Sequence, residues 1–122
     1  MSFGLQLQME QMPGYLAARF IGVALPHQVS RQFKSIAERC KLTNNDKLLI
    51  DTTKAEVEIS FMDRFYVAER AGIFRRYGIK VAFVGRPEQF YPQKFAAHIA
   101  RYRGLDVWTF SDFLAAEEWL LK

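Results

Sequence analysis

The sequence predicts a single α/β domain, residues 1–122, with a mixed, mostly parallel sheet, an N-terminal β-hairpin and four helices. The expected order of elements is β-β-α-β-α-β-α-β-α. Two observations predict this class. After an opening pair of strands, short strand-like segments alternate with segments of helical periodicity. The chain of 122 residues also has the length of one domain and contains no repeat or linker.

The first segments predict a hairpin and a helix. Residues 3–10 alternate apolar and polar side chains, which is typical of a half-buried strand, and Pro13-Gly14 marks a turn before a second strand at 15–22. Pro26 suits the first turn of a helix that ends near Lys41. One apolar stripe runs along that helix and consists of Val29, Phe33, Ile36, Ala37 and Cys40.

The middle of the chain predicts a buried strand and a second helix. Residues 47–52 contain the continuous apolar run Leu48-Leu49-Ile50, as strands that are covered on both faces do. Residues 53–59 are ambiguous. Ser60 and Asp63 have the spacing of a capping-box variant, so a helix is expected to begin here, continue to about Tyr77 and end at Gly78.

The last third of the chain predicts two further strand–helix pairs. Residues 79–85 form the clearest strand, which Arg86-Pro87-Glu88 ends, and a helix is expected at 92–103. A strand at 105–110 leads to a final helix capped by Ser111 or Asp112. The side chains expected to face inward are Phe95, Ile99 and Tyr102 on the first of these helices and Ala115, Trp119 and Leu120 on the last.

Composition and charge exclude several classes of protein. A hydrophobic fraction of 50% argues against disorder, and the single Cys40 cannot form an internal disulfide. No apolar run approaches the ~20 residues that a membrane span needs, and the N-terminus lacks the pattern of a signal peptide, so a cytoplasmic location is expected. The net charge of +4 comes from Lys and Arg residues spread along the sequence, which favours a solvated surface over nucleic-acid binding.

The sequence offers no constellation for catalysis. His27 and His98 are the only histidines, and no Cys, His or carboxylate cluster has the spacing of a metal site. There is also no Gly-rich phosphate loop. We therefore expect no enzymatic activity, no metal and no cofactor.

The candidate binding site follows from the expected topology. In open α/β sheets, ligands bind beyond the carboxyl ends of the strands, where the loops after neighbouring strands meet. A helix start in that position offers free N–H groups to an anion, and arginine and lysine side chains add charge-assisted bonds. The residues expected to meet there are Asp51, Thr52, Thr53, Lys54, Ser60, Asp63, Arg64 and Arg86, although capping and loop closure would account for several of them as well.

The second helix is a candidate interface because its aromatic side chains spread around more than one face. A helix packed on a sheet buries a single stripe, so part of this apolar surface is expected to stay exposed, unless the core stripe is simply wide. The interface candidates are Phe61, Phe65, Tyr66 and Phe74.

Two stretches resemble the STAS domain, the fold of bacterial anti-sigma factor antagonists. Leu48-Leu49-Ile50-Asp51 followed by Ile59-Ser60-Phe61-Met62-Asp63 is similar to the family's apolar strand, short loop and second helix start. Residues 103–112, with the Trp119-Leu120 ending, are similar to the end of small stand-alone STAS-like proteins. The family places a phosphorylatable Ser or Thr after the Asp, whereas here Asp63 is followed by Arg64. The resemblance therefore implies the fold and a binding surface, without the phosphorylation switch.

Two functions of different classes remain open. The first is a non-catalytic protein-interaction module of a bacterial signalling pathway, with a protein partner that can be a second copy of the chain. The second is a carrier or sensor of a small ligand (a nucleotide, an anion or a lipid), since some STAS-like domains bind such molecules and the fold resembles that of CRAL-TRIO lipid carriers.

Overall fold

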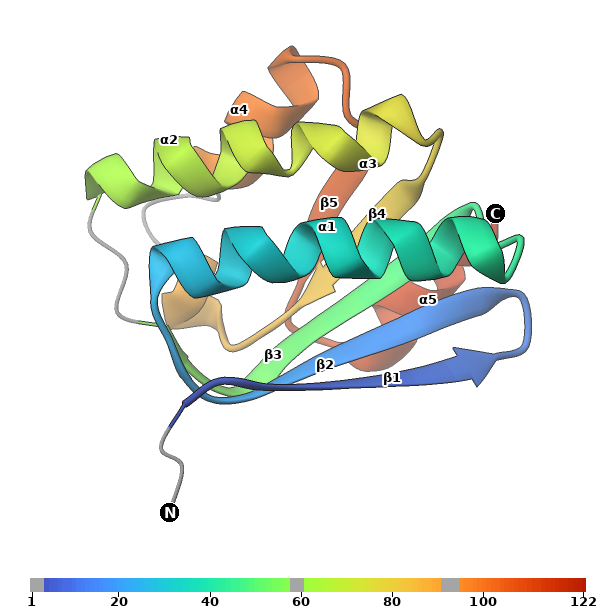
Figure 1. Cartoon of the computed structure of the whole chain (residues 1–122), viewed down its shortest axis with the longest axis horizontal. Coiled ribbons are helices and arrows are strands. Elements are labelled where there is room, and N and C mark those ends of the chain that lie inside the picture. Colours follow the sequence, from blue (N-terminus) through green and yellow to red (C-terminus); the bar gives the residue numbers. More distant parts are fainter. Residues whose placement is uncertain (1–3, 58–60, 91–94) are drawn as a thin grey trace.

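The computed structural model describes residues 4–57, 61–90 and 95–122. It shows one five-stranded sheet with strand order β1-β2-β3-β4-β5. The helices α1, α2, α3 and α4 lie on one face of this sheet and α5 lies on the other (Figure 1). The predicted mixed, mostly parallel sheet with its opening hairpin is thus confirmed.

The hairpin consists of β1 (Gln6–Met12) and β2 (Tyr15–Ala24), which pair antiparallel and are closed by the pair Met12↔Tyr15. The turn between them is Pro13-Gly14, as the sequence predicts. Gly14 has a φ of 86°, a conformation that residues with a Cβ rarely adopt. The first strand lies further along the chain than the expected 3–10, and residues 1–3 are outside the described part.

The parallel part of the sheet contains β3 (Lys47–Val57), β4 (Lys80–Val84) and β5 (Val107–Phe110). Ile50 pairs with Phe83 in parallel register, so the two apolar runs lie side by side at the centre of the sheet. The ambiguous segment after Thr52 continues β3, because β2 is long enough to pair with it there. After a register shift between Arg19 and Ile21, β2 pairs with β3 as far as Val57.

The larger core lies under α1 (Pro26–Leu42). All five residues of its predicted stripe are buried, and Phe33 packs its ring 5.2 Å from that of Phe74. The smaller core lies under α5 (Phe113–Leu121), where Ala116 and Leu120 are buried. There the buried Tyr15 hydroxyl donates a 2.6 Å hydrogen bond to Glu117, and burial together with this carboxylate raises the pKa of Tyr15. Asp112, rather than Ser111, caps α5 by accepting from the N–H groups of residues 114 and 115.

Three details differ from expectation. The second helix is divided into α2 (Phe61–Arg70) and α3 (Gly72–Arg76), with Gly72, a poor helix former, at the junction. On α4 (Phe95–Tyr102), Ile99 packs against the core as expected, whereas Tyr102 is 92% exposed and the buried positions belong to Ala97 and Ala100. The side chain of Phe95 lies outside the described residues. On α5, Ala115 is exposed and the neighbouring Ala116 takes the expected inward place. A short 3₁₀ turn, η1 (Pro87–Phe90), follows β4.

Candidate functional site at the carboxyl ends of the strands

Two side chains that follow β4 hold the distal part of β3 by its backbone. Gln89 Nε2 donates to the carbonyl oxygens of Thr52 and Ala55, both at 2.9 Å. The Arg86 guanidinium donates to the carbonyl oxygen of Thr53 and, at 3.1 Å, to that of Ala55. Gln89 Oε1 in turn accepts from the backbone N–H of Arg86 at 2.8 Å and lies 3.1 Å from Thr52 Oγ1. We call Thr52, Arg86 and Gln89 the polar clamp.

Gly85 makes the polar clamp sterically possible. A Cβ at this position would lie 2.4 Å from Gln89 Oε1, 2.7 Å from Thr52 Oγ1 and 2.9 Å from Phe90 Cζ. These distances are shorter than carbon and oxygen atoms tolerate, so a side chain here would displace the clamp. The glycine therefore serves close approach, because its φ is not in the left-handed region.

The predicted loop residues occupy different positions around the clamp. Thr52, Thr53 and Arg86 come together, as the topology predicts. Asp51 turns to the neighbouring strand, where it lies 3.4 Å from Arg19, and it also accepts from the backbone N–H of Thr53 at 2.9 Å. Lys54 is exposed.

The helix start of the candidate site is described only in part. Asp63, in the first turn of α2, is half-buried. Ser60 and the side chain of Arg64 lie outside the described residues, so their part in the site stays a prediction.

The Arg86 guanidinium of the clamp has few hydrogen-bond donors left for an anion. The Nε of Arg86 lies 3.0 Å from Glu88, and its two terminal nitrogens donate to backbone carbonyls. The guanidinium that the sequence offers as an anion ligand thus already stabilises the protein itself. The Glu88 carboxylate accepts from its own backbone N–H and from Arg86, which lowers the pKa of Glu88.

The aromatic residues of the second helix divide into a buried and an exposed set. Phe74 is fully buried against Phe33, so its place in the predicted interface was wrong: the ring belongs to the core. Tyr66 is 39% exposed, and hydrogen bonds with Ser30 and Arg70 lower the pKa of its phenol. The side chains of Phe61 and Phe65 lie outside the described residues. Tyr66 therefore carries the interface prediction within the described part of the chain.

An apolar cavity of about 120 Å³ lies between the helices and the sheet, next to the clamp. Small side chains on α2, α4, β2 and β3 leave this space: six of its lining residues are alanines. Thr52 and Gln89 stand at its polar end. The lining residues are Phe20, Ala24, Val29, Phe33, Thr52, Ala55, Val67, Ala68, Ala71, Phe83, Gln89, Phe90, Ala97, Ala100, Leu105, Val107 and Thr109.

Sequence reasoning missed both Gln89 and the cavity. Glutamine occurs widely on protein surfaces, and only the η1 turn directs Gln89 back onto β3. The alanines carry no signal individually, because alanine is equally common in helices and in cores. The one available hint was Gly85, a glycine directly after a buried strand, which indicates close approach of another group.

The described residues contain no group of three or more His, Cys, Asp or Glu side chains able to hold a metal ion. His98 packs edge-on against Trp108 with ring centroids 5.2 Å apart. None of the helices in the described part of the chain is long and apolar enough to cross a membrane.

Comparison with solved structures gives matches over nearly the whole chain. An anti-sigma factor antagonist from Mycobacterium paratuberculosis matches with a TM-score of 0.66 over 100% of this chain and 98% of its own, at 8% identity. The anti-sigma factor antagonist SpoIIAA in its unphosphorylated form gives a TM-score of 0.53 over 93% and 95%, at 11% identity. An uncharacterized DUF3478 protein with a SpoIIAA-like fold from Shewanella loihica gives 0.59 over 96% and 94%, at 22% identity.

This chain has the SpoIIAA-like fold. The fold that the resemblance to STAS domains implied is thereby confirmed. At these identities the SpoIIAA-like fold is what the comparisons establish. No protein-family model matches the chain, and the curated proteins give no match either.

Proposed function

We propose that the chain is a non-catalytic regulatory module of a bacterial, cytoplasmic signalling pathway that works by binding a protein partner. The observation that carries this proposal is the SpoIIAA-like fold over the whole chain, shared with two anti-sigma factor antagonists. The binding surface is the start of α2, at the same end of the sheet as the polar clamp (Figure 1), with Asp63, Arg64 and the exposed Tyr66. The resemblance to STAS domains matches Arg64 with the family's phosphorylatable residue, so we expect this surface to work without that phosphorylation switch.

Site-specific photo-crosslinking in living cells tests the partner. Benzoylphenylalanine at Tyr66 is expected to give a discrete protein adduct, whereas the same group at the exposed Lys122, on the opposite side of the sheet, gives none. The adduct protein should then bind the purified chain, and Tyr66→Arg should weaken this binding while the melting temperature holds. An adduct of twice the 14.2 kDa mass identifies a homodimer. The proposal is wrong if benzoylphenylalanine at position 66 gives no protein adduct that is absent when the same group is at position 122.

The cavity favours a second candidate function, the binding of a small apolar ligand. An engineered cavity of about 150 Å³ in another protein binds benzene, so the cavity of about 120 Å³ suits a single ring or a short alkyl chain. Its lining is almost entirely apolar, and Arg86 is engaged by the backbone, so nucleotides and anions fit less well.

A thermal-shift screen separates these ligand classes. Benzene, indole and short alkanes should raise the melting temperature, and phosphate and nucleotides should not. Ala68→Leu, which fills the cavity, should abolish the shift, while Ala115→Leu on the exposed side of α5 keeps it. Equal shifts in the two variants would exclude the cavity as the site.

A further inference from the structure

The positive charge of the chain is concentrated on one side of the sheet. The helix layer, which we define as residues 26–42, 61–76 and 95–103, contains ten Lys and Arg residues against three Asp and Glu residues, a formal charge of +7. The rest of the chain contains seven against ten, a formal charge of −3. The dispersed cations of the sequence are thus gathered by the fold, which the net charge of +4 does not indicate.

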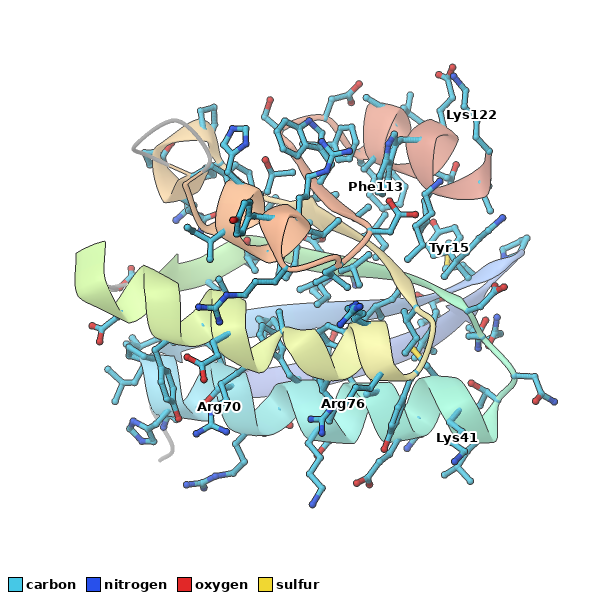
Figure 2. The ribbon with its side chains drawn as sticks, turned by 90° about the horizontal axis from the view of Figure 1, so that it is seen from above. Tyr15, Lys41, Arg70, Arg76, Phe113 and Lys122 are labelled. Carbon is cyan, nitrogen blue, oxygen red and sulfur yellow. The ribbon has the colours of Figure 1, made fainter. Side chains whose placement is uncertain are left out.

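The cations of the helix layer whose side chains are described are exposed to solvent. Figure 2 shows Arg70, Arg76 and Lys41 along the same side of the molecule, over α1 and the α2–α3 segment, with Phe113 and Lys122 on the opposite side. In the described part of the chain, Arg103 is the one cation of this layer within 4 Å of a carboxylate, at 3.8 Å from Glu69. The exposed cations are Arg31, Lys34, Arg39, Lys41, Arg70, Arg75, Arg76, Arg101 and Arg103.

The kind of cation and its neighbours indicate the class of partner. Eight of the ten arginines of the chain lie in the helix layer, whereas five of the seven lysines lie elsewhere. Exposed tyrosines accompany them: Arg70 stacks over Tyr66 at 5.1 Å, and Lys41 lies 5.7 Å from the ring of Tyr77. Arginine and tyrosine are enriched in protein–protein interfaces, where lysine is depleted. The guanidinium also pairs with a carboxylate through two parallel hydrogen bonds.

We infer that the helix layer docks a protein partner through a carboxylate-rich surface of that partner. The inference rests on the proposed function and adds the chemistry of the partner to it. Arg31 and Arg39 on α1 and Arg70 and Arg76 on the α2–α3 segment present guanidinium groups to Asp and Glu side chains. Tyr66 and Tyr77 supply flat contact area between these charges. The helix layer includes the start of α2, so one partner can cover both.

Fluorescence anisotropy with labelled poly-L-glutamate as the probe tests this inference on the full chain. Poly-L-glutamate should bind at low salt, and raising NaCl from about 0.05 to 0.5 M should weaken binding by tenfold or more, since the screening length falls below about 5 Å. Arg76→Glu should weaken binding by about fivefold to tenfold. Lys122→Glu changes the net charge by the same amount, but on the side of the sheet opposite the helix layer. This control should change the affinity for poly-L-glutamate by no more than about twofold. Lys34→Glu replaces Arg76→Glu if that variant is unfolded.

An RNA oligonucleotide and vesicles that contain phosphatidylglycerol are tested in parallel. Tighter binding of either probe than of poly-L-glutamate, with the same dependence on Arg76, overturns the inference in favour of a nucleic acid or a membrane. Equal losses in Arg76→Glu and Lys122→Glu, or no binding of poly-L-glutamate, also overturn it. In all these cases the photo-crosslinked adduct at Tyr66 is unaffected, so a failure here is distinct from a failure of the proposed function.

Discussion

Gly85→Ala is expected to destabilise the protein strongly, because the added Cβ collides with the polar clamp. Gln89 is the nearest obstacle, at 2.4 Å, and moving it breaks its bonds to the backbone of Thr52, Ala55 and Arg86. At about 1 kcal/mol for each of these three hydrogen bonds, the loss is about 2–4 kcal/mol. For a domain of 122 residues this corresponds to a fall in melting temperature of roughly 8–16 °C.

Urea unfolding monitored by circular dichroism measures this loss, with Gly72→Ala as the matched control. A Cβ at Gly72 meets nothing within 4 Å, and the residue begins α3, so alanine there should be neutral or stabilise by up to about 1 kcal/mol. A double-mutant cycle adds a second check. In a Gln89→Ala background the main obstacle is gone, and Gly85→Ala should cost roughly half as much. Equal effects of Gly85→Ala and Gly72→Ala, or full additivity with Gln89→Ala, would refute the clamp.

Three further predictions concern the cavity, Cys40 and the cap of α5. Ala68→Leu, which fills the cavity, should raise the free energy of unfolding by about 1–2 kcal/mol in the same urea titration. This gain is smaller than the ~3 kcal/mol that a cavity of 120 Å³ costs. The control Ala115→Leu should change the free energy of unfolding by no more than about 0.5 kcal/mol. Burial raises the pKa of the Cys40 thiol from its ordinary value near 9 to about 11. The folded state therefore holds this proton more tightly, so the contribution of Cys40 to stability is complete below pH 9 and falls by about 2 kcal/mol as pH rises to 11. A Cys40→Ala variant should lack that part of the fall, and an unchanged pH profile would contradict the assignment. Asp112→Ala should cost about 1 kcal/mol through loss of the N-cap, and Ser111→Ala almost nothing; the reverse order in thermal unfolding would contradict the capping assignment.

The sheet and most of the large core could be predicted from the sequence, because the patterns that indicate them are local. The run around Ile50 and the run around Phe83 are each short, apolar and bounded by turns, which leaves little choice other than buried parallel strands. The α1 stripe was equally clear because the other side of this helix consists of polar and charged residues, among them Arg31, Gln32, Lys34 and Glu38. These features depend on periodicity alone, so one sequence sufficed to predict them.

Two errors concern aromatic residues on helices: the sequence predicts that Tyr102 faces inward and that Phe74 lies at an exposed interface. Tyr102 and Phe74 are both aromatic residues on helices of the same face, yet the first is 92% exposed and the second is fully buried. Among the described side chains of α4, the buried ones are Ala97 and Ala100, which let the helix approach its neighbours closely. Helix spacing is set by the tertiary packing of several elements, and no periodicity within one helix reports it. The cavity arises from the same alanines and was missed for the same reason.

The clamp and the cavity share two residues, and this predicts communication between a ligand and a partner. Thr52 and Gln89 line the polar end of the cavity, and Gln89 also holds the backbone of the distal part of β3 at Thr52 and Ala55. A ligand that contacts Gln89 will favour one arrangement of the distal part of β3, and a partner bound at this end of the sheet will favour one as well. Such coupling is reciprocal, so the ligand must change partner affinity by the same factor as the partner changes ligand affinity.

Titration calorimetry measures this factor. The purified chain is titrated with the partner that photo-crosslinking identifies, once with indole and once without it. We expect a change of about fivefold or more in partner affinity, of the size that couplings between sites usually show. Gln89→Ala removes the shared contact while most of the cavity wall remains, so both binding events should persist and their coupling should fall towards one. A coupling factor that survives in Gln89→Ala would show that the clamp does not connect the two sites.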